Sequence, residues 1–410
     1  MSQNSLPPES SSPLQAKLGS SRGYYFFVVA YLVGMSALGS FVNDMYSPAL
    51  PAMCRFFHCS VSTVQMGMTT GMIGLALGQI ILGPMSDRYG RKPVLVGSVY
   101  LFIVAAVVSV FSPTIHFFVW CRLFQGLGAA GGYFLARTIP ADVYSGRQLA
   151  KLMALVGAIN GIAPASAPII GGVTADAFGW QGIFVVLVVF ALVVLACSGA
   201  LKESLPVSRR TSGAWWRSYG GYGVMLRNRP FMIHVVFKGL ALGLLFAYIT
   251  SSSFILQNHY GLSQTLYGCV IGFNALFVAA GSMTALRFHP LKRAATAGSL
   301  VMAVGAVGQA VALCTVHSIV LFEVLAVTML FGLGLIFTTT NTLAMNEGRQ
   351  QAGEASSVLG VSGYAVGAVV MPLVGIGDVI HSAAAIYACM AVLIVVCAYA
   401  SRALPADLDS

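Results

Sequence analysis

Charged residues are scarce in this sequence. Only 8% of its 410 residues are Asp, Glu, Lys or Arg, whereas soluble globular proteins carry about 25%. Hydrophobic residues make up 57% of the chain, and the mean hydropathy is +0.83. This composition excludes a soluble globular protein and predicts an all-α polytopic membrane protein with little room for a soluble domain.

Motifs typical of enzymes are also lacking. The sequence has no Gly-rich phosphate loop and no cluster of metal ligands, and it leaves no soluble domain for nucleotide hydrolysis. A membrane-embedded enzyme should group several His, Asp or Glu residues on facing helices, and a sensor should carry an additional signalling domain. The sequence therefore predicts no enzyme, no ATP-driven pump, no metal site and no cofactor.

Cysteine is sparse and mostly isolated. Six of the eight Cys lie singly in apolar stretches, where Cys is usually a small buried hydrophobe. Only Cys54 and Cys59 share a predicted loop. They form a disulfide if that loop is extracytoplasmic, or they are two unpaired thiols, since nothing in their spacing requires a bridge.

Long apolar segments are what the sequence does have. Windows of about 20 apolar residues predict twelve transmembrane helices. We expect them at residues 23–53, 64–85, 93–111, 115–136, 149–170, 181–201, 230–256, 266–286, 294–313, 319–344, 355–374 and 383–402. They divide the chain into six-helix bundles at 23–201 and 230–402, a cytoplasmic linker at 202–229, a disordered cytoplasmic tail at 1–22 and a cytoplasmic tail at 403–410.

Basic residues set the expected orientation. If the amino terminus is cytoplasmic, 19 of the 22 Lys and Arg fall on the inner side and only Arg55 falls in an outer loop. Both termini are therefore expected in the cytoplasm, and the net charge of +10 reflects membrane topology rather than nucleic-acid binding. Basic loops recur at 87–92 and 287–293, which suggests two pseudo-symmetric halves.

The loop at 83–93 carries the first recognisable motif. Its pattern Gly83-x-x-x-Asp87-Arg88-x-Gly90-Arg91-Lys92-Pro93 resembles, at every defining position, the signature of the major facilitator superfamily between its second and third helices. We expect this loop to act as a conformational latch that links the two halves on the cytoplasmic side. In that role Asp87 caps the helix at 355–374, beside Glu354, and Arg88 or Arg91 meets Asp142.

Two further motifs indicate an antiporter. Arg122-x-x-Gln125-Gly126-x-Gly128-x-Ala130 resembles the motif of this superfamily whose arginine is associated with proton coupling. In the fifth predicted span, a run of small residues resembles the motif of the drug:proton antiporter branch, with Ala167 where Gly is usual. Its members here are Gly157, Gly161, Pro164, Pro168, Gly171 and Gly172.

Shorter segments narrow the resemblance to the bicyclomycin and chloramphenicol resistance group. They lie at 44–51, 180–184, 202–206, 246–249 and 352–357. The resemblance implies multidrug efflux and antibiotic resistance: export of a small amphipathic molecule in exchange for protons, by a monomer in the bacterial inner membrane. The protein's partners would be its small-molecule substrate, protons and the lipid bilayer, and no nucleic acid. A symporter that imports a nutrient is the alternative.

Asp44 and Arg122 are the candidate proton-coupling residues. Asp44 is the only acid well inside the apolar segments of the first half, about 30 Å along its helix from Tyr24. A lone carboxylate in a low dielectric is readily neutralised by a proton. The helix of Arg122 runs the opposite way and places it about 13 Å deep from the outer side, so both residues lie in the outer half and can pair. Two alternatives stay open: Asp44 merely faces water at a helix end, or Arg122 only binds backbone carbonyls.

Polar residues at helical spacing are candidates for a substrate cavity, although each of them can equally serve interhelical hydrogen bonding. Lys238 either reaches back to the cytoplasmic interface or faces the cavity, where it would favour anionic or neutral substrates. Glu323 is expected at the outer interface. The candidate cavity residues are Tyr31, Asn43, Gln125, Tyr133, Asn160, Lys238, Tyr248, Asn274, Asn341 and Tyr364.

Overall fold

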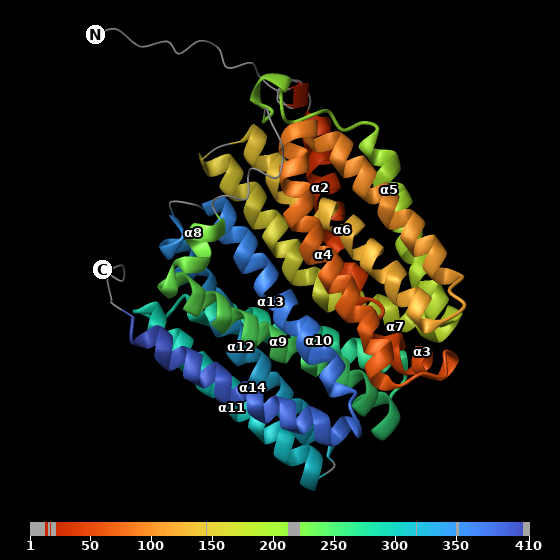
Figure 1. Cartoon of the computed structure of the whole chain (residues 1–410), viewed down its shortest axis with the longest axis vertical. Coiled ribbons are helices and arrows are strands. Elements are labelled where there is room, and N and C mark those ends of the chain that lie inside the picture. The colour runs from red at the N-terminus through yellow and green to blue at the C-terminus, as the bar shows by residue number, and fades with distance from the viewer. Residues whose placement is uncertain are drawn as a thin grey trace.

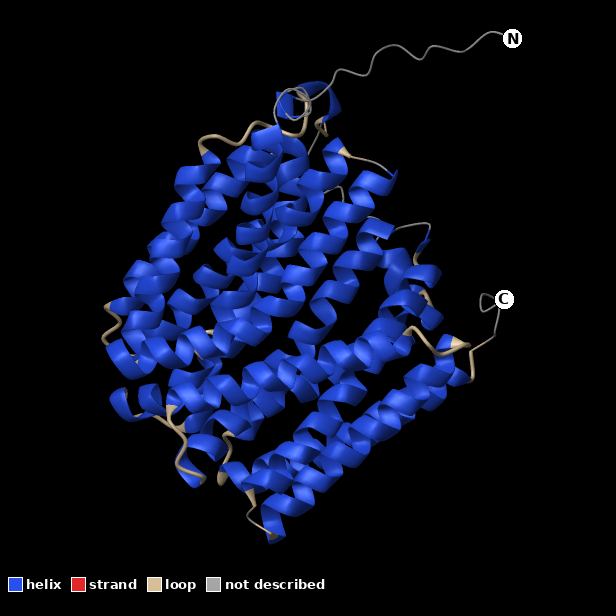
Figure 2. Cartoon of the chain, turned by 180° about the vertical axis from the view of Figure 1, so that it is seen from behind, coloured by secondary structure: helices blue, strands red, loops and turns tan. Residues whose placement is uncertain are grey.

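The computed structural model describes residues 13–14, 17, 22–144, 146–211, 222–316, 318–349 and 352–404, without the side chains of 22, 146, 147, 150, 151, 154–161, 222, 224, 352 and 353. Across these ranges the chain is helical and contains no strand (Figure 2). Each apolar segment satisfies its backbone hydrogen bonds internally, as a lipid-embedded chain requires.

Twelve long helices form the described part of the chain, as the sequence predicts. The first half contains α2 (Arg22–Asp44), η1 (Ser47–Ala49), α3 (Leu50–Phe56), α4 (Val61–Tyr89), α5 (Arg91–Val110), α6 (Ile115–Val143) and α7 (Gly146–Ser198). The connection contains η2 (Val207–Arg209) and α8 (Tyr222–Arg227). The second half contains α9 (Arg229–Phe254), η4 (Ile255–His259), α10 (Gln264–Ala285), α11 (Leu291–Thr315), α12 (Ile319–Glu347), α13 (Ala352–Val374) and α14 (Val379–Arg402).

The segment α7 contains two of the twelve helices. They meet at Gly179, whose φ of 71° lies in the left-handed region where only glycine is unstrained. Ten segments of the described chain are long and apolar enough to cross a membrane, and α6 is not one of them. This helix carries Arg122, Gln125 and several glycines, which lower its hydropathy.

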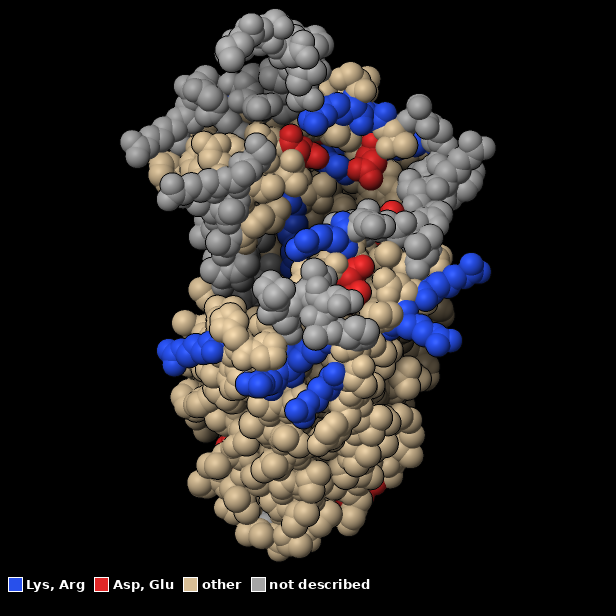
Figure 3. Space-filling view, turned by 90° about the vertical axis from the view of Figure 1, so that its left-hand side faces the viewer, with Lys and Arg blue, Asp and Glu red and all other residues tan. Residues whose placement is uncertain are grey.

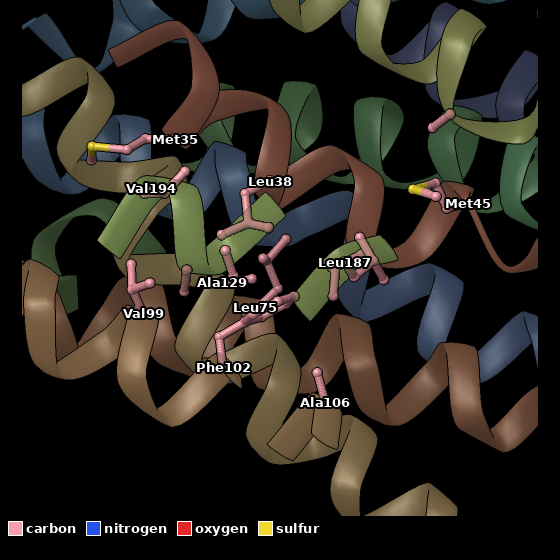
Figure 4. Close-up of a cluster of buried hydrophobic side chains, with 14 of the residues drawn as sticks. Met35, Leu38, Met45, Leu75, Val99, Phe102, Ala106, Ala129, Leu187 and Val194 are labelled. Atoms are coloured by element: carbon pink, nitrogen blue, oxygen red, sulfur yellow. The ribbon is translucent and has the colours of Figure 1, made fainter. Parts of the chain in front are cut away.

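The helices pack as two bundles, each around its own core (Figure 1). The first core joins buried side chains of α2, α4, α5, α6 and α7, among them Leu38, Leu75, Phe102, Ala129 and Leu187 (Figure 4). The second core joins α9 through α14. The chain therefore has two packed bodies that meet along a seam.

The first predicted span ends earlier than its hydrophobicity suggests. A continuous helix was expected over 23–53, but α2 ends at Asp44 and the chain turns through η1 before α3. Pro48 and Pro51 enforce this break, because each occupies the first turn of a new short helix. The turn places Asp44 at a helix end. Cys54 lies in α3 and Cys59 in the loop after it, and both are free thiols.

Glycines bring the second and fourth helices of each half into backbone contact. A Cβ on Gly74 would lie 2.1 Å from the carbonyl oxygen of Leu123, and one on Gly126 would lie 2.0 Å from that of Gly71. The second half repeats the arrangement. A Cβ on Gly281 would lie 2.1 Å from the carbonyl oxygen of Phe331, and one on Gly334 would lie 2.1 Å from that of Val278. The two halves share this internal architecture, with helices joined by small residues.

Candidate functional site

The described contacts between the halves concentrate at one end of the molecule. We call the end that carries Arg88, Lys92 and Arg293 the basic end, and the other the distal end. Figure 3 looks onto the basic end, where Lys and Arg side chains gather with several acids. At the distal end, hydrogen bonds cross from half to half: Ser253 Oγ to the Ser47 carbonyl (2.7 Å), Gln257 Nε2 to the Pro48 carbonyl (2.8 Å), Ser62 Oγ to the Pro372 carbonyl (3.0 Å) and Thr265 Oγ1 to the Asp176 carboxylate (2.6 Å).

The small residues of the predicted antiporter motif form part of this distal seam. A Cβ on Gly172 would lie 2.3 Å from the carbonyl oxygen of Gln264 in α10. In return, a Cβ on Gly268 of α10 would lie 2.2 Å from the carbonyl oxygen of Pro168. Gly171 packs instead within the first half, where a Cβ on it would lie 1.8 Å from the carbonyl oxygen of Met45. The seam therefore leaves no room for larger side chains at these positions. The side chains at 157 and 161 lie outside the described part of the chain.

A cavity of about 620 Å³ lies between the halves. The first half lines it with Asp44, Ser47, Tyr133, Arg137, Pro164 and Pro168. The second half supplies mainly apolar side chains of α9, α10 and α12, together with Tyr248 and Asn274. A largely apolar wall with a few convergent polar groups is typical of a small-molecule site.

Asp44 is the acid that lines the cavity wall. It is half-buried at the end of α2, and among the described residues its carboxylate makes no ion pair or hydrogen bond. The Ser47 hydroxyl binds the backbone carbonyl of Asp44 and leaves the carboxylate unengaged. This carboxylate is therefore open to a proton or to a polar group of a substrate.

Arg122 does not pair with Asp44, so the hypothesis of an Asp44–Arg122 ion pair is wrong for this conformation. The guanidinium is fully buried and donates to the carbonyls of Val42 (2.8 Å) and Gly67 (3.3 Å) and to Asn43 Oδ1 (2.8 Å). It also donates to Gln125 Oε1 and lies 4.4 Å from the centre of the Tyr46 ring. Neither Asn43 nor Gln125 is among the residues that line the cavity described above, so they are not cavity residues in this conformation.

Arg137 is the cation in the cavity wall, and the sequence pattern did not reveal it. Its guanidinium donates to Tyr133 Oη (2.8 Å) and lies 4.4 Å from the centre of that ring. Tyr364, from the second half, stacks on Phe246 and interacts electrostatically with Tyr133, Arg137 and Asp44. Arg137 follows Arg122 on the same helix, and this position is the sequence feature that could have indicated a cavity residue. A negative and a positive group thus face one cavity from the same half.

Three further predicted cavity residues lie elsewhere. Lys238 is buried, donates to Asn341 Oδ1 (2.8 Å) and the Leu359 carbonyl (3.1 Å), and neither reaches the interface nor lines the cavity. Asn341 is thereby engaged as its partner. Tyr31 packs on Phe27 inside the first half, because its ring is apolar enough for the core. The side chain at Asn160 is outside the described part of the chain. Tyr133, Tyr248 and Asn274 do line the cavity.

The predicted loop at 83–93 is the end of α4 and the start of α5, joined at Gly90, and its contacts lie on the first-half side of the molecule. Arg91 bridges two acids, with Nε 2.9 Å from Asp142 Oδ2 and Nη1 2.5 Å from Asp87 Oδ1. The Glu203 carboxylate accepts the backbone N–H groups of Arg91 (2.9 Å) and Lys92 (3.2 Å) at the start of α5. Gly90 has φ of 102°, and a Cβ there would lie 2.6 Å from Glu203 Oε2. Glycine is therefore required at this turn.

The predicted contact of Asp87 with the second half is wrong for this conformation. Asp87 binds Arg91, four residues along the chain, and in the described ranges no bond joins it to α13 or to Glu354. Its cation partner in this conformation is therefore the neighbouring Arg91. Arg91 rather than Arg88 meets Asp142, while Arg88 lies over the ring of Tyr89. Gly83 faces the ring of Phe134.

Comparison with known proteins decides the family. The sequence profile of the Major Facilitator Superfamily matches residues 32–372. The chain belongs to this superfamily. A major facilitator of Bacillus subtilis strain 168, the uncharacterized MFS-type transporter YdgK, is 33% identical over 357 residues, which are 85% of this chain and 89% of YdgK. The multidrug resistance protein MdtL of Escherichia coli O127:H6 is 28% identical over 324 residues, 78% of this chain and 81% of MdtL.

Solved major facilitators share the fold. The xylose transporter XylE of E. coli superposes with a TM-score of 0.73 at 16% identity, over 93% of this chain and 98% of XylE. The bacterial homologue of the lysosomal transporter Spinster superposes with a TM-score of 0.71 at 14% identity, over 93% of this chain and 96% of its own. This major facilitator is therefore a multi-pass membrane transporter and not an enzyme.

Proposed function

We propose that the protein exports small amphipathic molecules, antibiotics among them, in exchange for protons. The observation that carries the proposal is the unengaged Asp44 carboxylate in the wall of a largely apolar cavity. A relative named as a multidrug resistance protein supports the export of drugs. The proposal includes a monomer in the bacterial cytoplasmic membrane, with the basic end and both termini in the cytoplasm.

Competition for Asp44 would couple the two fluxes. A cationic or hydrogen-bonding drug binds the ionised carboxylate, whereas a proton neutralises that carboxylate and weakens the drug's binding. Because linkage is reciprocal, drug binding at one face then releases a proton, and protonation at the other face releases the drug. Arg137 sits in the same wall and would select against simple cations, so zwitterionic or neutral amphipathic drugs fit the site best.

Alternating access would proceed by opening the distal seam and closing the basic end. The pair Asp176 and Thr265 crosses this seam, with a hydrogen bond of 2.6 Å between the side chains. We expect a disulfide between Asp176→Cys and Thr265→Cys, in a background whose eight native Cys are Ser, to abolish transport in proteoliposomes. A reductant should restore transport, and each single variant should be insensitive to oxidant. Undiminished transport by the crosslinked protein would contradict this mechanism.

A drug-susceptibility panel tests the proposed function. We expect expression in an efflux-deficient E. coli host to raise the minimal inhibitory concentration of at least one compound among chloramphenicol, bicyclomycin, a fluoroquinolone and ethidium. The Asp44→Asn variant, expressed to the same level, should give no protection. The same compound should release protons from the purified protein.

Import of a nutrient is the alternative outcome. If no compound in the panel is exported and an imposed inward proton gradient instead drives accumulation of a sugar or amino acid, the protein is a symporter. The same fold can support export or import, so only the measured direction of substrate flux distinguishes an antiporter from a symporter.

A further inference from the structure

Glu323 is a half-buried acid that the proposed coupling mechanism does not use. It lies four residues into α12, about 6 Å along the helix from Ile319 at the distal end. Its Oε2 accepts a hydrogen bond from Asn274 Nδ2 (2.8 Å). Its Oε1 is fully buried and has no hydrogen-bond partner. The sequence pattern predicted a residue at the outer interface, but the structure places this carboxyl group inside the second half.

No cation compensates this carboxyl group in the described part of the chain. The ionisable groups that interact with it electrostatically are three phenols: Tyr248 of α9, Tyr267 of α10 and Tyr387 of α14. From α11, Gln309 donates to the carbonyl of the neighbouring Phe322 and supplies no charge. An uncompensated buried charge costs several kcal/mol, so the surroundings favour the neutral acid.

A short hydrogen-bonded chain connects Glu323 to the cavity. Asn274 Nδ2 donates both to Glu323 Oε2 and to Tyr248 Oη, each at 2.8 Å. Asn274 and Tyr248 themselves line the cavity, whereas Glu323 lies behind them. A water molecule or ligand in the cavity that binds Tyr248 or Asn274 therefore competes with the hydrogen bond to Glu323.

We propose that Glu323 is a second proton-binding site, in the opposite half from Asp44, whose protonation is coupled to the cavity through Asn274 and Tyr248. When a cavity ligand draws the Asn274 amide away, the ionised form of Glu323 loses its one hydrogen bond, and the neutral form becomes still more favoured. When the distal seam opens and water enters, ionisation becomes possible. The transport role rests on the proposed proton-coupled function, but the proton site itself does not.

Infrared titration of the purified protein tests the proton site with the proton as the only probe. In the Asp44→Asn background, which removes the other candidate acid, we expect a carboxylic-acid C=O band at neutral pH that shifts in deuterium oxide. Adding Glu323→Gln should remove this band, and adding Tyr248→Phe should shift its frequency. The matched control Glu347→Gln, at an exposed residue of the same helix, should leave the band unchanged.

Two outcomes would overturn the inference. If the Glu323→Gln protein is monodisperse and folded but shows the same band as its parent, Glu323 is ionised and is no proton site. If the band disappears with Glu323→Gln but Tyr248→Phe does not shift it, the coupling to the cavity is wrong.

Proton counting in proteoliposomes separates this inference from the proposed function. The Glu323→Gln variant should move fewer protons per substrate than the wild type. If the wild-type protein moves no protons, the proposed function is wrong. The infrared result would still decide whether Glu323 binds a proton.

Discussion

Replacing Asp44 by Asn is expected to abolish proton-driven transport and to leave the protein folded. The amide keeps the shape of the side chain but cannot bind or release a proton. Asp44 makes no ion pair or hydrogen bond that the substitution would break among the described residues, so the free energy of unfolding should change little. We expect drug transport driven by a pH gradient to fall to the level of empty vesicles, as measured by fluorescence in proteoliposomes.

The matched control for this variant is Asp378→Asn. Asp378 lies at the distal end, where its carboxylate caps α14 by accepting the N–H groups of Ile380 and His381. It is not one of the residues that line the cavity. Its substitution should leave transport intact. If Asp44→Asn retained gradient-driven transport at the wild-type rate, the proton would have to bind elsewhere, and Asp44 would merely face solvent at a helix end.

Replacing Arg122 by Ala should cause the largest loss of stability. The substitution would leave the carbonyls of Val42 and Gly67 and the side-chain oxygens of Asn43 and Gln125 without their donor. Each buried unsatisfied acceptor costs about 1–3 kcal/mol, so we expect a loss on the order of 3 kcal/mol or more. A thiol-reactive dye assay of thermal unfolding in detergent will report it as a lower midpoint.

The variant Arg122→Lys separates charge from geometry. Lysine keeps the positive charge but has one nitrogen in place of the three that Arg122 uses, so it should recover only part of the lost stability. A variant Arg122→Ala that unfolds at the wild-type temperature would show that these hydrogen bonds contribute nothing net. If Arg122→Ala stays folded yet fails to couple protons, Arg122 acts on Asp44 in a conformation other than this one, in which the distal seam is closed.

The sequence predicts the number of helices and the basic loop well, because hydrophobic length and charge are properties of each segment alone. It also identifies Asp44 as an isolated acid. Contacts between side chains of different helices are harder to predict, because they depend on how each helix is rotated about its axis. The Arg122 guanidinium is fully buried among carbonyl and amide oxygens and the rings of Tyr46 and Phe184, and periodicity does not predict these partners. Sequence reasoning therefore paired it with the wrong residue.

Arg137 and Glu323 were missed for a related reason. Both lie near predicted helix ends, where a charged side chain costs little free energy because it is normally expected to be solvated. In the structure α6 continues to Val143, and Arg137, although exposed, lines the cavity. Glu323 accepts a hydrogen bond from Asn274 of α10, a partner on another helix that no local sequence pattern encodes.

The repeated glycine contacts determine where this molecule can bend. Gly74 with Gly126, and Gly281 with Gly334, bring α4 against α6 and α10 against α12 at backbone distance, so neither pair can slide without a clash. We therefore expect each half to move as one body, so that alternating access separates the contacts of α7 with α10 and of α4 with α13 rather than rearranging the helices within a half. Substitutions in the cavity can then change which molecules bind without changing how the two halves move. A methyl group added at Gly172 or Gly268 should instead prevent the distal seam from closing and reduce transport of every substrate.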